Sequence, residues 1–172
     1  MIGASYSKGP FSAYANLAHA VDTGRGLITS QFSFDQATLN YAKSHDIYLD
    51  HDQDYALSAG ASYLWRGTRI GADLIYGSGL RRDLDLANPI AYPDGSQLDA
   101  IPNGATVPGY TQVNLALSHL FDLGAAGTLQ ARLDVINLAD ARYEIRDGSG
   151  VGVFAPQYGA RRGVFVGMSK SF

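Results

Sequence analysis

The chain has 172 residues, of which 46% are hydrophobic and 17% are charged, and this composition excludes an intrinsically disordered protein. A formal net charge of −3 argues against a nucleic-acid-binding protein, and the lack of cysteine excludes disulfides and thiolate metal sites. Apolar runs are only a few residues long, far short of the roughly 20 that a membrane-spanning helix needs.

Alternating apolar and polar residues predict β-strands along almost the whole chain. A weak strand precedes the turn Lys8-Gly9-Pro10, and clearer patterns cover residues 11–21, 55–65, 68–79, 110–121, 128–145 and 161–172. Short turns alternate with long polar segments over residues 22–53, 80–108 and 146–160, and one of these contains a helix signal at 35–44, with Asp35 as N-cap. We expect an all-β fold, an antiparallel meander of about seven strands with short turns at one end and long loops at the other.

The two faces of the strands indicate the environment of the sheet. One register is apolar, and its members are expected to face lipid: Leu115, Leu117, Leu133, Val135, Val164 and Val166. The opposite register carries small and charged residues that suit a wet lumen, including Arg69, Asp73, Arg132 and Asp134. Strands of about ten residues, aromatic residues near strand ends and unequal connections favour the wall of a transmembrane β-barrel. A soluble all-β binding module is the alternative.

The number of strands decides whether the sheet can close into a barrel. The first and last of seven antiparallel strands run in the same direction, so they cannot pair antiparallel with each other. We expect either an additional strand within residues 27–53 or an open, curled sheet with two free edges.

Nearly the whole chain resembles a known family, and the C-terminal part does so most specifically. The stretch "LDVINLADARYEIRDGSGVGVFAPQYGARRG", and especially "INLADARY", is similar to the end of the barrel domain of TonB-dependent outer-membrane receptors. Ala139 and Ala160 depart mildly from the family pattern. The alternation of Val164, Val166, Met168 and Phe172 resembles the signal that the outer-membrane assembly machinery reads.

The resemblance implies a location and a function. It implies a bacterial outer-membrane receptor that takes up a ferric siderophore or a similar nutrient, with outer-membrane lipid, the assembly machinery and TonB as partners. We expect residues 1–172 to be a single domain, a C-terminal fragment of the barrel without the plug domain, and therefore not transport-competent alone. We expect no enzymatic activity, no cofactor and no nucleic-acid partner. The alternative function is a small autonomous outer-membrane barrel with a structural, adhesive or passive-pore role.

Two groups of loop residues are site candidates. Arg146, Asp147, Tyr158, Arg161 and Arg162 lie where outer loops would meet a ligand, and the arginines suit an anionic one, although solvated strand-end charges are the simpler interpretation. His45, Asp50, His51 and Asp52 are weak candidates for a metal site, because imidazole and carboxylate groups bind divalent metals. A solvated, charged loop is the favoured interpretation of that segment.

Overall fold

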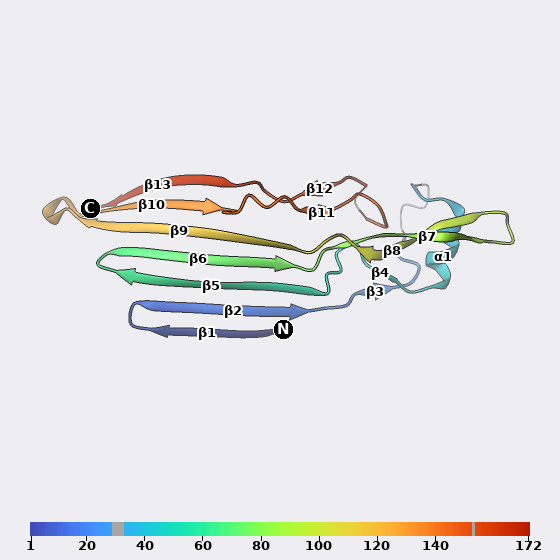
Figure 1. Cartoon of the computed structure of the whole chain (residues 1–172), viewed down its shortest axis with the longest axis horizontal. Helices are drawn as coiled ribbons and strands as arrows, with labels where there is room; N and C mark the ends of the chain where they lie inside the picture. The colour runs from blue at the N-terminus through green and yellow to red at the C-terminus, as the bar shows by residue number, and fades with distance from the viewer. Residues whose placement is uncertain (29–32, 153) are drawn as a thin grey trace.

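A seven-stranded antiparallel sheet dominates the computed structural model, which describes residues 1–28, 33–152 and 154–172 (Figure 1). Neighbouring strands follow one another in the order β1-β2-β5-β6-β9-β10-β13. Their bounds are Ile2–Lys8, Phe11–His19, Tyr55–Trp65, Thr68–Gly77, Tyr110–Asp122, Thr128–Ile136 and Gly163–Ser171. The predicted meander of seven antiparallel strands is confirmed.

Short turns join the strands at one end of this sheet. The two-residue turn Arg66–Gly67 has positive φ angles of 46° and 80°, and Gly9 opens the β1–β2 turn with a φ of 57°. Such conformations match the twist of hairpins, and glycine adopts them without strain. The third short connection contains the 3₁₀ turn η2, Gly124–Ala126. All three turns lie at the left-hand end of the sheet in Figure 1.

The long connections gather at the opposite end and carry structure of their own (Figure 1). Three two-stranded sheets lie there: β3 (Thr23–Gly24) with β4 (Ile47–Tyr48), β7 (Arg81–Ala91) with β8 (Gln97–Thr106), and β11 (Glu144–Arg146) with β12 (Gln157–Tyr158). The predicted helix is confirmed as α1, Gln36–Ser44, and the Asp35 side chain caps it by accepting from Thr38 N at 2.7 Å. None of the described helices has the length and hydrophobicity to cross a membrane. We call residues 20–54, 78–109 and 137–162, as far as they are described, the loop cap.

Several predicted boundaries were wrong. Residues 80–108 were expected to form a loop but contain the β7–β8 hairpin. The strand expected over 128–145 ends at Ile136, because Asn137 adopts a positive φ of 51° that strands do not tolerate. The last strand begins at Gly163 rather than 161, so Arg161 and Arg162 precede it.

The buried hydrophobic side chains lie outside the large sheet. Among the described residues they are Ile28, Ala37, Ala42, Ile47, Leu98 and Val107, all in the loop cap. A small core forms where α1 and β4 meet, with Ile28, Ala42 and Ile47 at its centre. The described part of the seven-stranded sheet therefore has no packed apolar core of its own.

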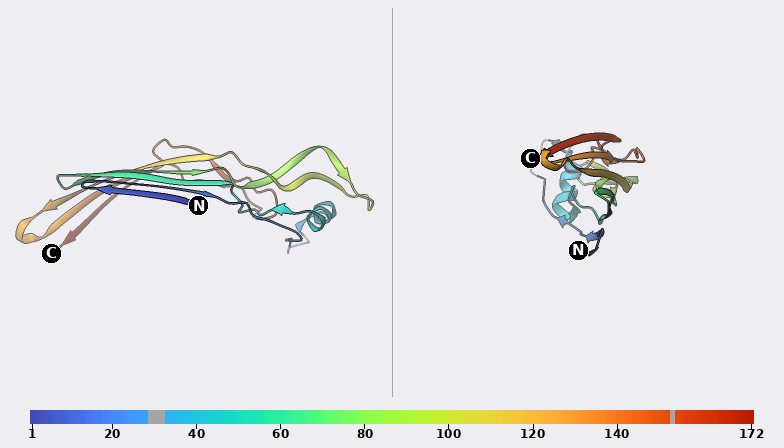
Figure 2. Two further views of the ribbon diagram at one scale, coloured as in Figure 1. Left: turned by 90° about the horizontal axis from the view of Figure 1, so that it is seen from below. Right: turned by 90° about the vertical axis from the view of Figure 1, so that its left-hand side faces the viewer.

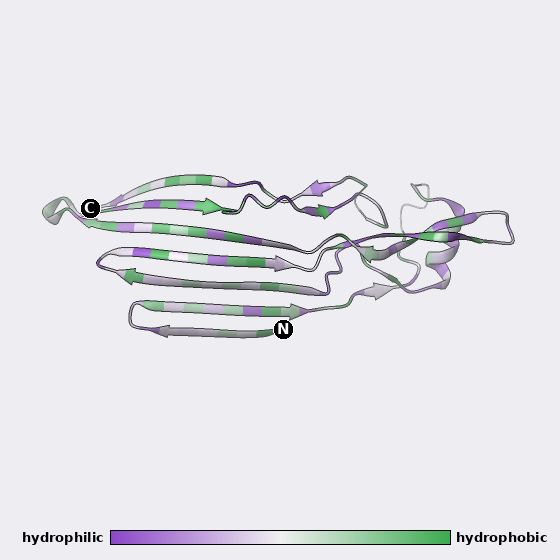
Figure 3. Cartoon of the chain, viewed as in Figure 1, coloured by the Kyte–Doolittle hydropathy of each residue, from purple (hydrophilic) through white to green (hydrophobic). Residues whose placement is uncertain are grey.

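The apolar register of the sheet is exposed instead. Aligned triplets such as Leu117–Leu133–Val166 cross neighbouring strands on one face. Val166 is 77% exposed and Met168 is 71% exposed. Colouring by hydropathy shows the alternation as contrasting bands along β6, β9 and β10 (Figure 3). A surface this apolar without a cover is exceptional in a soluble monomer.

The sheet is curved and its edges stay apart. Seen end-on, its strands follow an arc rather than a flat plane (Figure 2). The edge strands β1 and β13 run in the same direction and do not pair with each other. β3 and β4 pair as a separate two-stranded sheet, so neither extends the large sheet, which stays open within the described residues.

Candidate functional site: loop cap and sheet faces

Arg81 is the centre of the loop cap. Its buried guanidinium donates to Asp52 Oδ2 and to Asp54 Oδ1, each at 2.6 Å, and lies 3.6 Å from the ring centroid of Tyr48. Asp52 is itself fully buried and also accepts from the backbone N–H of Asp22 at 2.6 Å. Two carboxylates and an aromatic face thus compensate the cost of burying one cation. This arrangement joins the start of β7 to the segment that precedes β5.

Asp50 and Arg146 form a second link within the loop cap. The guanidinium of Arg146 donates to Asp50, which also contacts His51 Nδ1 at 2.6 Å. Burial acts to raise the pKa of Asp50, but the hydrogen bonds from Arg146 and His51 outweigh it, and the pKa lies below its usual value. Asp50 is therefore a charged residue that holds β11 against the first long loop.

Asn103 joins three segments of the cap. Its buried side chain donates to Tyr48 O at 2.8 Å and accepts from Val151 N at 3.0 Å, while its backbone N–H donates to Asp83 Oδ1 at 3.0 Å. Burial raises the pKa of Asp83, against the backbone hydrogen bonds from Asn103 and Gly150. The cap is thus a connected polar network rather than three independent loops.

The residues of "INLADARY" form a junction between β10 and β13. The Asn137 amide group is fully buried, donates to the carbonyl oxygens of Ala141 and Ala160 at 2.9 Å each, and accepts from Ala141 N. Asp140 accepts from the guanidinium of Arg161 and from the backbone N–H of Arg162. Those hydrogen bonds, the side-chain one from Arg161 foremost, hold the pKa of Asp140 far below its usual range. These motif residues position the entry into the last strand.

Tyr143 extends this junction to β9. Its hydroxyl donates to Gln112 Oε1 at 2.8 Å, and its ring stacks on Tyr110 with centroids 4.3 Å apart. Sequence reasoning identified the motif but not these contacts, since none of the partners is near it in the chain.

The structure separates the five candidates for ligand contact. Arg146 is buried in its pair with Asp50, and Asp147 accepts hydrogen bonds from Ser149 in a local turn. Tyr158, in β12, is 69% exposed. Arg161 and Arg162 are exposed neighbours that both bind Asp140.

The four metal candidates have other partners. Asp50 pairs with Arg146 and His51, and Asp52 pairs with Arg81. His45 ends α1, exposed, and stacks on Tyr41 with ring centroids 4.2 Å apart. Within residues 1–28, 33–152 and 154–172, no group of three or more His, Asp or Glu side chains is arranged to hold a metal ion.

The faces of the large sheet follow the predicted registers. Leu117, Leu133 and Val166 align across β9, β10 and β13, as do Leu115, Val135 and Val164. On the other face the charged residues find polar partners: Arg132 binds Asp134, Arg69 donates to Ser62, and Asp73 accepts from Asn114. The predicted terminal pattern, Val164, Val166, Met168 and Phe172, lies on the exposed apolar register and ends on the turn side of the sheet.

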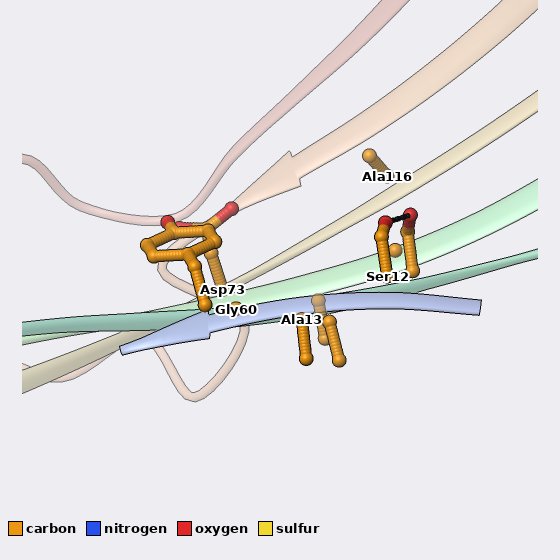
Figure 4. A pocket seen from close by; sticks show the side chains of 10 residues that line it. Ser12, Ala13, Gly60, Asp73 and Ala116 are labelled. Atoms are coloured by element: carbon orange, nitrogen blue, oxygen red, sulfur yellow. Dashed lines mark hydrogen bonds between the residues drawn. The ribbon is translucent and has the colours of Figure 1, made fainter. Parts of the chain in front are cut away.

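A shallow hollow of about 260 Å³ marks the polar face (Figure 4). Small residues such as Gly60 and Ala116 form part of its lining, and Ser12 and Ser62 meet at 2.9 Å beside it. Tyr14 lies over Gly60, where an added Cβ would come within 2.6 Å of the Tyr14 ring. Small residues thus line most of the hollow, and Ser12, Ser62 and Asp73 supply polar groups to it.

Comparisons with protein-family models, with curated proteins and with solved structures found no match for this chain.

Proposed function

We propose that this chain forms part of the wall of a transmembrane β-barrel in the bacterial outer membrane. The observation that carries the proposal is the exposed apolar face of the seven-stranded sheet. Among the described residues, the buried hydrophobic side chains all lie in the loop cap and none of them packs on this face. Removing apolar surface from water is favourable by about 25 cal/mol per Å², so the sheet is more stable with this face in lipid than in water. Six strands of the large sheet have nine to thirteen residues, the length that a tilted strand needs to cross a bilayer: β2, β5, β6, β9, β10 and β13.

The position of the loop cap supports the same proposal. Every long connection lies at one end of the sheet and every short turn at the other, as in bacterial barrels with short periplasmic turns and long outer loops. We place the turns on the periplasmic side and the loop cap outside the cell. The parallel edges β1 and β13 fit a wall segment that further strands complete, and they do not fit a seven-stranded barrel closed on itself.

The receptor assignment rests on the C-terminal sequence. The resemblance of "INLADARY" and of the terminal strand to TonB-dependent receptors supports a role in uptake of a siderophore-type nutrient. In this proposal the exposed part of the loop cap, including Tyr158, Arg161 and Arg162, contacts the ligand, and Phe172 belongs to the assembly signal. In a full-length receptor that carries this C-terminus, Phe172→Asp should lower the fraction of the receptor in the outer membrane. Unchanged assembly would show that Phe172 is not part of the assembly signal.

Folding into lipid tests the wall proposal. Open sheet edges are not stable in hydrocarbon, so the chain is tested as the C-terminal part of a complete barrel. That barrel, diluted from denaturant into phospholipid vesicles, should gain β-structure and protection from protease, while dilution into buffer alone should give aggregates. Leu117→Arg, on the apolar register, should destabilise the inserted state by roughly 2–4 kcal/mol. Ala116→Arg, one residue before Leu117 on the polar register and opposite Asp134 in β10, should cost much less. A folded, monodisperse protein in buffer without lipid or detergent would contradict the proposal.

A further inference from the structure

Basic side chains dominate the turn end of the sheet. Lys8 ends β1, Arg66 lies in the β5–β6 turn, and Lys170 lies near the end of β13. All three are exposed. The acid at this end is Asp122, and its carboxylate is used locally as an acceptor for Gly124 N at 2.8 Å. We call Lys8, Arg66 and Lys170 the basic rim.

Aromatic rings hold the basic rim at the border of the apolar face. The guanidinium of Arg66 lies 5.2 Å from the ring centroid of Trp65, and the ammonium of Lys170 lies 4.4 Å from that of Phe172. Lys8 is paired across the strands with Phe11. Aromatic rings beside cations are the side chains that favour the boundary between hydrocarbon and headgroups.

The rim cations lack acidic partners, in contrast to those of the loop cap. Among the described residues, neither Lys8, Arg66 nor Lys170 forms an ion pair, whereas the loop cap pairs Arg25, Arg81, Arg146 and Arg161 with aspartates. Thirteen of the sixteen acidic residues lie in the loop-cap segments, whereas only eight of the thirteen basic residues do. The two ends of the sheet thus carry opposite charge.

We infer that the basic rim binds the headgroups of anionic phospholipids in the leaflet on the turn side. The inference rests on the proposed membrane location and adds the lipid class that this surface selects. The three cations are spread from one edge strand, through the centre, to the other edge strand, so they match a charged surface better than a single small anion. Each basic side chain at an anionic lipid surface strengthens binding by roughly fivefold.

Vesicle binding tests the inference. A complete barrel that carries this chain should associate with vesicles of mixed phosphatidylcholine and phosphatidylglycerol more strongly than with phosphatidylcholine alone, and added salt should reduce the difference. The triple variant Lys8→Gln, Arg66→Gln, Lys170→Gln should lose most of this preference and still fold into phosphatidylcholine. The matched variant Arg25→Gln, Lys43→Gln, Arg142→Gln removes the same charge from exposed loop-cap positions and should keep the preference.

The outcomes separate the inference from the proposed function. Insertion into both vesicle types with no preference for phosphatidylglycerol would overturn the inference and leave the barrel wall intact. An equal loss of preference in both triple variants would also overturn it, because net charge rather than the rim would then be responsible. Failure to insert into either vesicle type would overturn both proposals.

Discussion

Asp50 and Arg146 form an ion pair although 96 residues separate them in the chain. Both side chains are largely buried, so removing one partner leaves the other short of hydrogen bonds in a poorly hydrated place. We predict that Arg146→Ala loosens the loop cap by about 1–3 kcal/mol and speeds proteolysis within residues 137–162. Arg25→Ala is the control, because it breaks the exposed pair with Asp46 and should cost less than about 1 kcal/mol. Equal cleavage rates in the two variants would show that the buried pair is unimportant.

The junction before β13 should weaken at low pH. Asp140 has a pKa far below its usual range because Arg161 and Arg162 donate to its charged form. A carboxylate with a depressed folded-state pKa contributes stability that is complete above its unfolded pKa and is lost as pH falls through the folded pKa. The protection factors of residues 137–162 in hydrogen exchange, taken relative to the intrinsic rate at each pH, should therefore fall at strongly acidic pH. Asp140→Asn should show low protection already at neutral pH and a weaker acid dependence; an unaltered acid dependence in that variant would assign the effect to other carboxylates.

Asn137 should be the most sensitive residue of that junction. It is fully buried, its side chain takes part in three hydrogen bonds, and it adopts a positive φ of 51°. Asn137→Ala loses the side-chain hydrogen bonds and strains the backbone, and we expect a loss of roughly 2–4 kcal/mol. Asn137→Gly loses the same hydrogen bonds but tolerates the φ angle, so it should be less damaging than alanine. Thermal unfolding of the lipid-inserted barrel that carries this chain measures both losses. A glycine variant as damaging as alanine would exclude a backbone contribution.

Gly60 leaves the space that the ring of Tyr14 on β2 occupies. A Cβ at this position would meet the ring of Tyr14 at 2.6 Å and Ala72 O at 3.2 Å. Gly60→Val should therefore displace Tyr14 and lower the unfolding temperature. Tyr14→Ala combined with Gly60→Val should recover part of the loss, whereas additive losses would show that the two residues do not interact.

Features that depend on local sequence patterns were predicted correctly, and features that depend on contacts between distant segments were not. The strands of the large sheet and helix α1 were predictable because alternation and the Asp35 cap are local signals. The β7–β8 hairpin was missed because Pro89 and Pro102 interrupt its strands and its pairing shifts register. The early end of β10 and the burial of Arg146 depend on partners far along the chain, which no local pattern contains. For the same reason the sequence identified candidate ligand-binding residues but did not show which of them are buried in ion pairs and which are exposed.

The apolar register of the sheet should contact lipid, and single tryptophans at two adjacent positions of β9 test this most directly. Trp65 is the one tryptophan of the chain. Trp65→Phe, in a barrel whose other strands carry no tryptophan, therefore gives a background in which Leu117→Trp and Ser118→Trp each report one face of β9. In vesicles with brominated acyl chains, we expect strong quenching of the tryptophan at position 117 and little at position 118. Equal quenching at both positions, or none at position 117, would contradict this expectation.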